Sequence, residues 1–556
     1  MDDTELEASA GGPQDPIRGC EPDAVAIEPA DGNQGSFSED PPWLVDPAGF
    51  AWLRGLDMLR RGTREEAPFL IRRRRLPPGR HVLRALGAFG RALALWYLTD
   101  RKGSLSESRK GMSRRLRLAF HALGPTYIKL GQILSAGEGL FPEEVVSEFR
   151  LLRDHVPAED FETVKETIET ELGRPLEEVF ADLSTEPLAA ASIAQVHAGV
   201  LLGGERVVVK VQRSKVADLV SKDLAVMSWF APALVGRIPV AALANPPALV
   251  EVFAETVLEE LDFRLEAGNM LDLARVLGEL GQRRIIVARP HPRLVTKRVL
   301  VMERIDGFSW GEPESMRSSG IDTAAVLRAS TTAFVEGLMF HGMFHGDLHG
   351  GNLIVRPDGR VALLDFGIMG RLDERGRLAF VRLLLGVAMG DVSLQVEALQ
   401  ALGALPYGID EETIVRDFGL DSPPRDPLAM STQELSAEVR EMTKKLLSYG
   451  ARMPKELILF VKDMLFIDGA VAVMAPDVDL FAEVTMLVMY LAGRHGDRLA
   501  REIGLDPSEV KVDLSMLRNS MGLEETVQSL SYNQLRERRE IILKRLEGNK
   551  RRRRSR

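Results

Sequence analysis

The stretch HGDLHGGN at residues 345–352, followed by LDFG at residues 364–367, decides how this chain is interpreted. Asp347 stands five residues before Asn352 and eighteen residues before Asp365. In phosphoryl-transfer sites of the kinase type, one Asp orients the acceptor hydroxyl, an Asn five residues later binds Mg²⁺, and the Asp of Asp-Phe-Gly holds the metal that bridges the phosphates. These separations predict Asp347 as a catalytic residue and Asn352 and Asp365 as metal ligands.

The residues between the two motifs predict the geometry that such a site needs. The apolar runs LIV at 353–355 and VALL at 361–364 flank RPDGR at 356–360. An Asp-Gly pair between two apolar runs is a signal for a β-hairpin. A hairpin here would bring Asn352 and Asp365 side by side at the mouth of a cleft.

A phosphate-binding cation is predicted upstream, at Lys210 in the β-branched run RVVVKV. The alternative is a solvent-facing strand end. Ahead of it stands LAAASIAQVHAG at 188–199, where a kinase carries its glycine-rich loop. Alanine has a β-carbon, so this loop should be stiffer than a glycine loop. We expect Ala190, Ala191, Ser192 and Ile193 to cover the nucleotide, against the alternative of ordinary core packing.

Two further motifs, GPTYIKLGQ at 124–132 and ELDFRLEAGN at 260–269, complete a recognisable set. Together with the Ala-rich loop, VVVK, HGDLHGGN and DFG, they resemble the UbiB/AarF/ADCK family of atypical kinases. The resemblance implies an α+β, atypical protein-kinase-like bilobal fold. It would have a small β-rich N-lobe, a helical C-lobe and an N-terminal KxGQ helical extension. The chain departs from the family in lacking the usual Arg and Asp after KxGQ, and in carrying Gly350 where Pro is common.

The sequence alone does not decide which acidic residue of the 260–269 segment pairs with Lys210 and which pairs with Lys129. Apolar residues from 248 to 277 recur largely at helical spacing, and on a helix Glu260 and Asp262 would point about 200° apart. The resemblance suggests that Glu266 pairs with Lys210. A solvated acidic helix face is the alternative to any such pairing.

The remaining acids would meet the KxGQ element. The resemblance suggests that Glu260 or Asp262 pairs with Lys129 and, with Gln132 of the same motif, forms a regulatory contact over the cleft.

The resemblance also implies the activity. We expect Mg-dependent binding of ATP or ADP with ATP hydrolysis or phosphoryl transfer, Lys210 on the α and β phosphates, and Glu303 in a hinge facing adenine. The implied role is support of isoprenoid quinone or membrane-lipid metabolism, with lipid or quinone intermediates and protein partners from that metabolism. Two rival interpretations are a small-molecule phosphotransferase of the aminoglycoside-kinase type and a pseudokinase scaffold that binds nucleotide without turnover.

Composition sets the broad class. The chain has 556 residues, 45% hydrophobic content and a net charge of −10, so it carries no strong signal for coating nucleic acid. Its single cysteine, Cys20, fits a reducing compartment. No secretory signal or membrane-spanning stretch is recognised in the sequence, which favours a cytoplasmic protein or one peripheral at the inner membrane surface.

Charge patterning predicts the domain organisation. Residues 1–46 hold twelve acids and one base and should be disordered. Within the basic helical region 47–117, the amphipathic stretch 81–98 would lie on an anionic membrane or pack on the kinase lobe. The predicted units that follow are the KxGQ helical extension at 118–180, the N-lobe at 181–305, the helical C-lobe at 306–519 and a basic tail at 520–556.

Overall fold

The run RVVVKV lies in a five-stranded antiparallel sheet, which the computed structural model orders β1-β2-β3-β6-β5. Val207, Val209 and Val211 pack against helix α6 on one face of the sheet. Because side chains alternate along a strand, Lys210 points to the other face. The elements are β1 (Phe180–Ala190), β2 (Ala194–Leu201), β3 (Arg206–Gln212), β5 (Pro290–Val295), β6 (Val299–Glu303) and α6 (Phe161–Leu172).

The structure describes most of the chain, with gaps. The described residues are 35–38, 43, 50–72, 77–102, 105–136, 143–152, 157–234, 246–389, 391–406, 413, 416, 454–503, 531, 533, 534, 537 and 540. Cys20, the arginine run at 73–75 and nearly all of the predicted basic tail lie outside them.

The predicted hairpin is confirmed. Strands β9 and β10 pair antiparallel with Leu353 opposite Leu363, and the turn between them closes with a hydrogen bond from the Gly359 amide to the Arg356 carbonyl. Gly359 has φ +82°, a conformation that favours glycine. The strands of this part are β4 (Ile285–Val287), β7 (Phe308–Ser309), β8 (Met343–His345), β9 (Leu353–Val355), β10 (Val361–Leu363) and β11 (Met369–Arg371).

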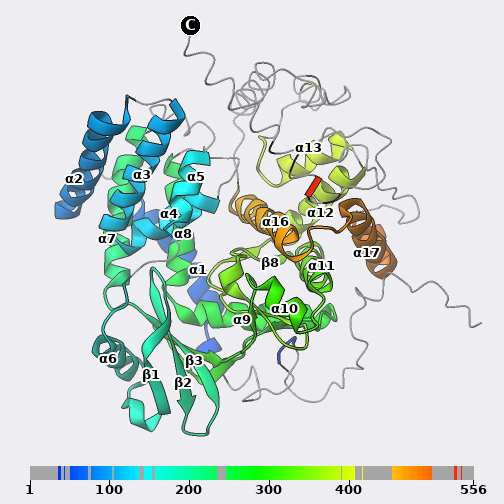
Figure 1. Ribbon diagram of the computed structural model, residues 1–556, viewed down its shortest axis with the longest axis horizontal. Coiled ribbons are helices and arrows are strands. Elements are labelled where there is room, and N and C mark those ends of the chain that lie inside the picture. Colours follow the sequence, from blue (N-terminus) through cyan, green and yellow to red (C-terminus); the bar gives the residue numbers. More distant parts are fainter. Residues whose placement is uncertain are drawn as a thin grey trace, which may run out of the picture.

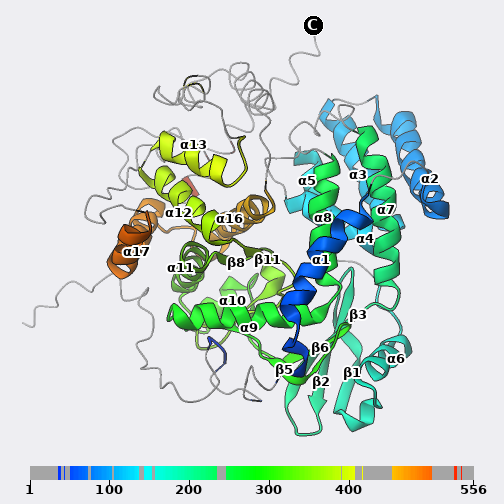
Figure 2. The same cartoon turned by 180° about the vertical axis from the view of Figure 1, so that it is seen from behind.

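A layer of helices stands beside the five-stranded sheet, at the upper left of Figure 1. Its interior is aromatic: Phe120 contacts Phe89, Tyr127 and Phe149 edge-on. Helix α1 packs along α8 and α9 on the opposite side of the molecule (Figure 2). The layer contains α1 (Leu56–Leu70), α2 (Gly79–Leu95), α3 (Leu105–Leu123), α4 (Pro125–Ala136), α5 (Glu143–Arg150), α7 (Val216–Leu234) and α8 (Pro246–Glu260).

The second lobe is mainly helical and lies on the right in Figure 1. Helix α9 connects it to the five-stranded sheet, since α9 packs on β5 and β6 as well as on α11. The helices are α9 (Phe263–Glu279), α10 (Pro313–Ser318), α11 (Thr323–His341), α12 (Glu374–Met389), α13 (Val392–Ala401), α16 (Lys455–Met474) and α17 (Leu480–Ile503). The predicted α+β bilobal class, with a sheet-rich N-lobe and a helical C-lobe, is therefore correct.

The structure corrects the prediction that residues 1–46 are disordered throughout. Ser36, Phe37 and Ser38 are buried, and Phe37 packs under the Arg289 guanidinium. The Ser36 amide donates to the Ala274 carbonyl, and its carbonyl accepts from the Val287 amide. These contacts outweigh the acidic composition around them, because they satisfy backbone groups on both sides of the segment.

The predicted domain limits also cut across the elements of the structure. The boundary at residue 118 falls inside α3, and of the helices assigned to the N-lobe, α7 packs on α4 of the predicted extension and α8 packs on α7 and α1. Strand β4, also assigned to the N-lobe, pairs in parallel with β10 of the C-lobe. These contacts are long-range, so local composition could not reveal them.

Candidate active site

Lys210 is held at the centre of the site by two carboxylates. Its Nζ lies 2.7 Å from Glu266 Oε1 and 3.2 Å from Asp365 Oδ2. The pairing with Glu266 that the resemblance suggested is therefore present, and it joins β3 to α9. Burial would lower the pKa of Lys210, but the charges of Asp365 and Glu266 outweigh it and raise that pKa above its ordinary value. Lys210 is thus a permanent cation.

The Asp-Phe-Gly segment is fixed by its neighbours. Phe366 is fully buried, and its carbonyl accepts a 2.9 Å hydrogen bond from Asn269 Nδ2. The His345 ring contacts the Asp365 carbonyl through Nε2 and accepts from the Asp347 amide through Nδ1. His345 therefore connects the two motifs that the sequence placed eighteen residues apart.

Asp365 is anchored yet accessible. Its Oδ1 accepts from the Gly367 amide at 2.9 Å, and its side chain remains 42% exposed. Partial burial opposes ionisation, but the charge of Lys210 and the Gly367 hydrogen bond lower the pKa of Asp365 to about 2. The carboxylate is ionised at neutral pH and can meet a cation.

Asn352 stands beside it, as predicted. The Leu364 amide donates to the Asn352 carbonyl at 3.1 Å, and Asn352 Nδ2 donates to the Asp347 carbonyl at 3.1 Å. Because Nδ2 is engaged in this hydrogen bond, the side-chain oxygen of Asn352 is the atom that could bind a metal ion. One carboxylate and one amide oxygen suit Mg²⁺, which usually takes few protein ligands and fills its octahedron with phosphate oxygens and water.

Asp347 contacts a residue that the sequence reasoning missed. Lys462 of α16 forms an ion pair with the Asp347 carboxylate. Burial would raise the pKa of Asp347, but the charges of Lys462 and Lys129 hold it well below its usual range. Asp463, the next residue of α16, accepts from the Leu348 amide at 3.0 Å. A Lys-Asp pair inside the otherwise apolar run LILFVKDMLFI at 457–467 was the available signal.

The KxGQ helix reaches the site through Lys129, whose Nζ lies 2.7 Å from Glu260 Oε1. Helix α4 packs closely on α5 because Gly131 has no side chain: a β-carbon there would lie 2.8 Å from Phe149 Cδ1 of α5. Gln132 lies half-buried on the same helix. Of the two acids left open for Lys129, the structure selects Glu260.

The predicted regulatory role of Asp262 is not supported by its contacts. The helix expected to continue through residues 248–277 is interrupted, since α8 ends at Glu260 and α9 begins at Phe263. Asp262 caps α9 by accepting from the Arg264 amide and pairs with the Arg264 guanidinium at 2.6 Å. Both carboxylate oxygens of Asp262 are taken up by Arg264, and Lys129 pairs with Glu260 instead.

The Ala-rich segment is the tip of the β1–β2 hairpin. The Ala191 amide bonds to the Ala194 carbonyl, and Arg213 Nε donates to the Ala191 carbonyl at 3.0 Å. Ser192 and Ile193 are buried and Ala191 is exposed. The tip is therefore held from below, consistent with the stiffness predicted for it, while its contact with a nucleotide stays a prediction.

The predicted hinge residue Glu303 ends β6, and its carboxylate is already engaged. It accepts from Ser38 Oγ and from the Arg289 amide. This side chain anchors residues 36–38, so any adenine contact would have to come from backbone groups nearby.

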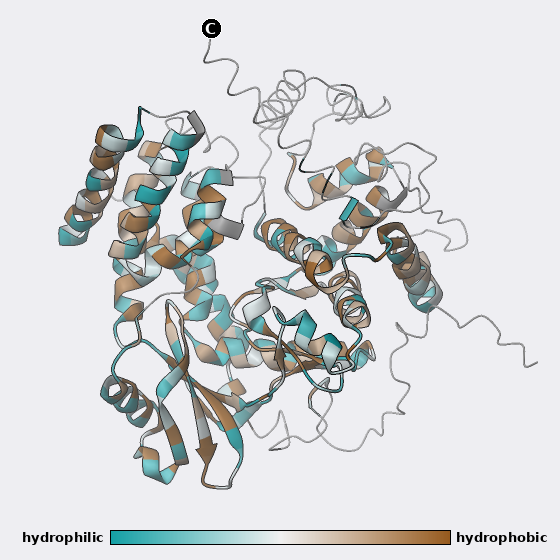
Figure 3. Cartoon of the chain, viewed as in Figure 1, coloured by the Kyte–Doolittle hydropathy of each residue, from teal (hydrophilic) through white to brown (hydrophobic). Residues whose placement is uncertain are grey.

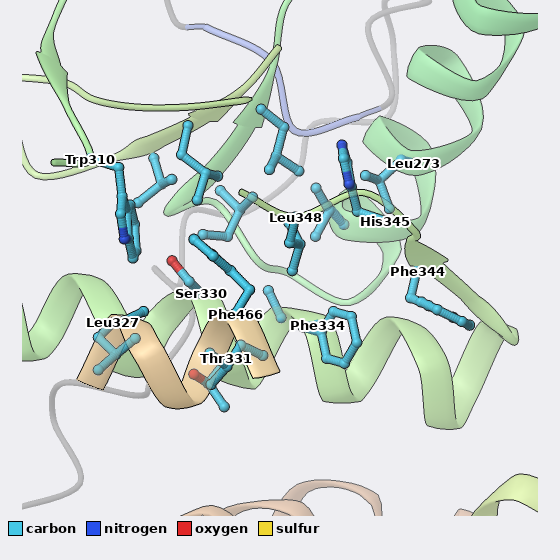
Figure 4. A pocket seen from close by; sticks show the side chains of 18 of the residues that line it. Leu273, Trp310, Leu327, Ser330, Thr331, Phe334, Phe344, His345, Leu348 and Phe466 are labelled. Carbon is cyan, nitrogen blue, oxygen red and sulfur yellow. The ribbon is translucent and has the colours of Figure 1, made fainter. Parts of the chain in front are cut away.

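An apolar cavity lies behind the catalytic loop (Figure 4). Trp310, Phe334 and Phe466 line it, together with His345 and Leu348 from either side of Asp347. Lys210, Asn352 and Asp365 are not among its lining residues, so it is separate from the charged cluster.

Comparisons with known proteins agree with this arrangement. A family profile described as the ABC1 atypical kinase-like domain matches residues 151–399. An uncharacterized protein of Mycobacterium tuberculosis is 34% identical over 369 residues, covering 65% of this chain and 75% of the relative. A chloroplastic aarF domain-containing protein kinase of Arabidopsis thaliana, itself uncharacterized, is 30% identical over 400 residues, covering 66% and 73%.

A third relative carries a more specific name. A probable protein kinase UbiB of Aliivibrio fischeri is 29% identical over 378 residues, covering 67% of this chain and 69% of that protein. The motifs, the bilobal fold and these matches lead to one conclusion: the chain belongs to the ABC1 atypical kinase-like family, which includes UbiB and aarF domain-containing kinases.

Proposed function

We propose that this protein binds Mg-ATP between its two lobes and hydrolyses it or transfers its terminal phosphoryl group. The observation that carries this proposal is the convergence of Lys210, Glu266 and Asp365, with ion-pair distances of 2.7 and 3.2 Å. A permanent cation beside an ionised, accessible carboxylate suits phosphates and a hard metal ion together. Bound Mg²⁺ would neutralise phosphate charge.

The chain's own residues have distinct roles in this proposal. Lys210 binds the α and β phosphates, Asn352 and Asp365 hold the metal, and Asp347 orients the acceptor hydroxyl or water. A lone pair of the acceptor oxygen forms the new bond to the γ-phosphorus while the bond to the bridging oxygen breaks, and ADP leaves with that electron pair. The acceptor's proton passes by way of Asp347 to solvent.

The proposed setting is the cytoplasmic face of a membrane, in support of isoprenoid quinone or other membrane-lipid metabolism. The resemblance of the motifs to the UbiB/AarF/ADCK family suggests this setting. A surface of this chain supports it independently, because Leu83, Leu86 and Leu93 of α2 are exposed beside Arg80 and Arg91. Apolar residues bordered by arginines suit an anionic lipid surface.

The first prediction tests the metal. Asp365→Asn should abolish the Mg-dependent part of ATP binding, because it removes the carboxylate that Mg²⁺ prefers. Dissociation constants for ATP measured by calorimetry, with Mg²⁺ and with EDTA, check this. Asp306→Asn, which alters an acid on the surface of the same lobe junction, serves as control. Equal Mg²⁺ dependence in Asp365→Asn and in the parent would contradict the proposal.

The second prediction tests turnover. Asp347→Asn should retain ATP binding and lower ADP release about a hundredfold or more, since a positioned acid or base contributes mainly in the transition state. ADP release is measured with and without anionic liposomes. A parent that binds Mg-ATP but releases no ADP under either condition would favour the pseudokinase scaffold. ADP release stimulated by aminoglycosides and not by lipid would favour the small-molecule phosphotransferase.

A further inference from the structure

Lys462 lies against the catalytic loop, but no role in the proposed reaction has yet been assigned to it. Its Nζ contacts the Asp347 carboxylate and lies 3.5 Å from the Gly346 carbonyl. Its side chain is 15% exposed, so it is largely sheltered from water.

The helix that carries Lys462 is fixed relative to the loop. Asp463 Oδ1 accepts from the Leu348 amide, one residue after Asp347. Leu459, one turn earlier on α16, packs directly against Gly346 of the loop. A β-carbon at Gly346 would lie 2.9 Å from Leu459 Cδ1, so the glycine allows this close approach. Because contacts on both sides of Lys462 hold α16 on the loop, the ammonium has a defined position.

The other two lysines of the site are held by carboxylates other than Asp347, and Lys210 is already assigned to the α and β phosphates. Lys210 is bound by Glu266 and Asp365, and Lys129 is bound by Glu260. During phosphoryl transfer, negative charge is spread over the oxygens of the transferred group, and preorganised cations stabilise it. Lys462 forms an ion pair with the Asp347 carboxylate itself, whereas Lys129 acts on Asp347 through its charge while paired with Glu260.

We propose that Lys462 is a catalytic residue that binds the terminal phosphoryl group of ATP beside Asp347. This assignment rests on the proposed function, in which Asp347 touches the attacking oxygen. A group in contact with Asp347 is then a neighbour of the phosphorus that this oxygen attacks. No bond to Lys462 forms or breaks in this step.

The test compares nucleotides that differ by one phosphoryl group. In Lys462→Met, the dissociation constant of Mg-ATP should rise about tenfold or more, since charge-assisted hydrogen bonds contribute on the order of 1.5–3 kcal/mol and each 1.4 kcal/mol is tenfold. The constant of Mg-ADP should change less than about twofold. Lys462→Arg keeps the charge and should keep the preference for ATP over ADP.

A matched control stands on the same helix. Lys455 is similarly sheltered and pairs with Glu259 at 3.0 Å, away from the catalytic loop. Lys455→Met should leave both dissociation constants as in the parent. Equal weakening of ATP and ADP binding in Lys462→Met, or no change in either, would overturn the assignment.

A second comparison separates a direct contact from an effect through Asp347. Losing Lys462 leaves Asp347 unpaired, and this carboxylate would then repel the phosphates. In an Asp347→Asn background that repulsion is absent. The double variant Asp347→Asn/Lys462→Met removes both charges of the ion pair, which destabilises the fold less than removing one of them. Asp347→Asn combined with Lys462→Met should still bind Mg-ATP about tenfold more weakly than Asp347→Asn alone. Equal affinities of these two variants would show that Lys462 only positions Asp347.

The parent and Asp365→Asn, measured in parallel, distinguish the two failures. If the parent binds no Mg-ATP, or if Asp365→Asn binds it equally well, the proposed function fails and the assignment of Lys462 fails with it. If both behave as expected and the Lys462 variants match the parent, the assignment alone is wrong.

Discussion

At the residue scale, the site consists of lysines that are each held by a carboxylate from another element. Lys210 of β3 meets Glu266 of α9, Lys129 of α4 meets Glu260 of α8, and Lys462 of α16 meets Asp347. Removing a charge from water is costly unless it is paired, and breaking such a pair leaves its partner uncompensated. The pairs therefore set the charge that a nucleotide meets and the relative positions of the elements.

The third prediction concerns pH and Glu266. Burial raises the pKa of this carboxyl to about 7, and the charge of Lys210 opposes the rise. Asp365, which also faces Lys210, has a pKa of about 2 and does not titrate near neutrality. As pH falls from 8 to 6, Glu266 takes up a proton and its ion pair with Lys210 weakens. We expect Mg-ATP affinity to fall severalfold over this range.

Stability should change in the opposite direction. Because the folded-state pKa of Glu266 lies above its ordinary value of 4.5, the folded protein binds this proton more tightly than the unfolded chain. Its contribution to stability is present at low pH and is lost as pH rises through about 7. Glu266→Gln should reduce both pH dependences, as measured by calorimetry and thermal unfolding at pH 6 and 8. If Mg-ATP affinity and thermal stability change with pH in Glu266→Gln as they do in the parent, another group is responsible for both pH dependences.

At the element scale, the break between α8 and α9 separates residues that the sequence places two positions apart. Glu260 ends α8 and faces Lys129, while Asp262 caps α9. An uninterrupted helix would have turned one of them away from the cleft without giving it a partner. The interruption lets both carboxylates be satisfied, each by a different element.

The fourth prediction follows from this separation. Asp262→Ala should lower stability by about 1 kcal/mol, as loss of an N-cap usually does, and should leave the Mg-ATP dissociation constant within about twofold of the parent. Glu260→Gln should weaken Mg-ATP binding, because Lys129, freed from its partner, would be attracted to Asp347 and Asp365. Thermal unfolding and calorimetry on both variants check this. A larger effect on nucleotide binding from Asp262→Ala would contradict it.

At the scale of the whole molecule, α2 lies at the outer edge of the helical layer, and its ribbon mixes hydrophilic and hydrophobic residues (Figure 3). Val82, Ala85 and Ala92 are buried where α2 packs on α3 and α7 of the helical layer, whereas one of the two expectations had this helix pack on the kinase lobe. Leu83 nevertheless remains 71% exposed. None of the described helices has the length and apolarity to cross a bilayer.

The fifth prediction tests α2 as a membrane-facing surface. Replacing Leu83 and Leu86 by Ser should reduce co-sedimentation with liposomes that contain anionic lipid severalfold, since each leucine would otherwise bury apolar surface. Leu188 and Leu202 are similarly exposed on the N-lobe sheet, and their replacement by Ser serves as matched control. Equal binding by both double variants, or binding indifferent to lipid charge, would remove α2 from the proposed interface.

Local sequence patterns were sufficient for part of the site. The spacing of Asp347, Asn352 and Asp365, with an Asp-Gly turn between two strands, predicted their meeting at one edge, and the structure places them there. Lys462 was missed because its partner is 115 residues away and nothing local marks a lysine on a helix as part of a distant loop. The order in residues 36–38 was missed because acidic composition is judged locally, whereas their hydrogen bonds go to residues 274 and 287.

The sequence by itself determined the hairpin that precedes Asp365 and the residue types that a phosphate and metal site needs, because turn chemistry and motif spacing act over a few residues. The bilobal α+β class followed from the resemblance of the motifs to a known family. Tertiary structure alone decided that Glu260 meets Lys129 and that Asp347 meets Lys462. Glu260 and Asp262 have the same charge and similar reach, so their roles depend on where α8 ends. Ion pairs between elements far apart in the chain depend on packing, and no local pattern encodes that packing.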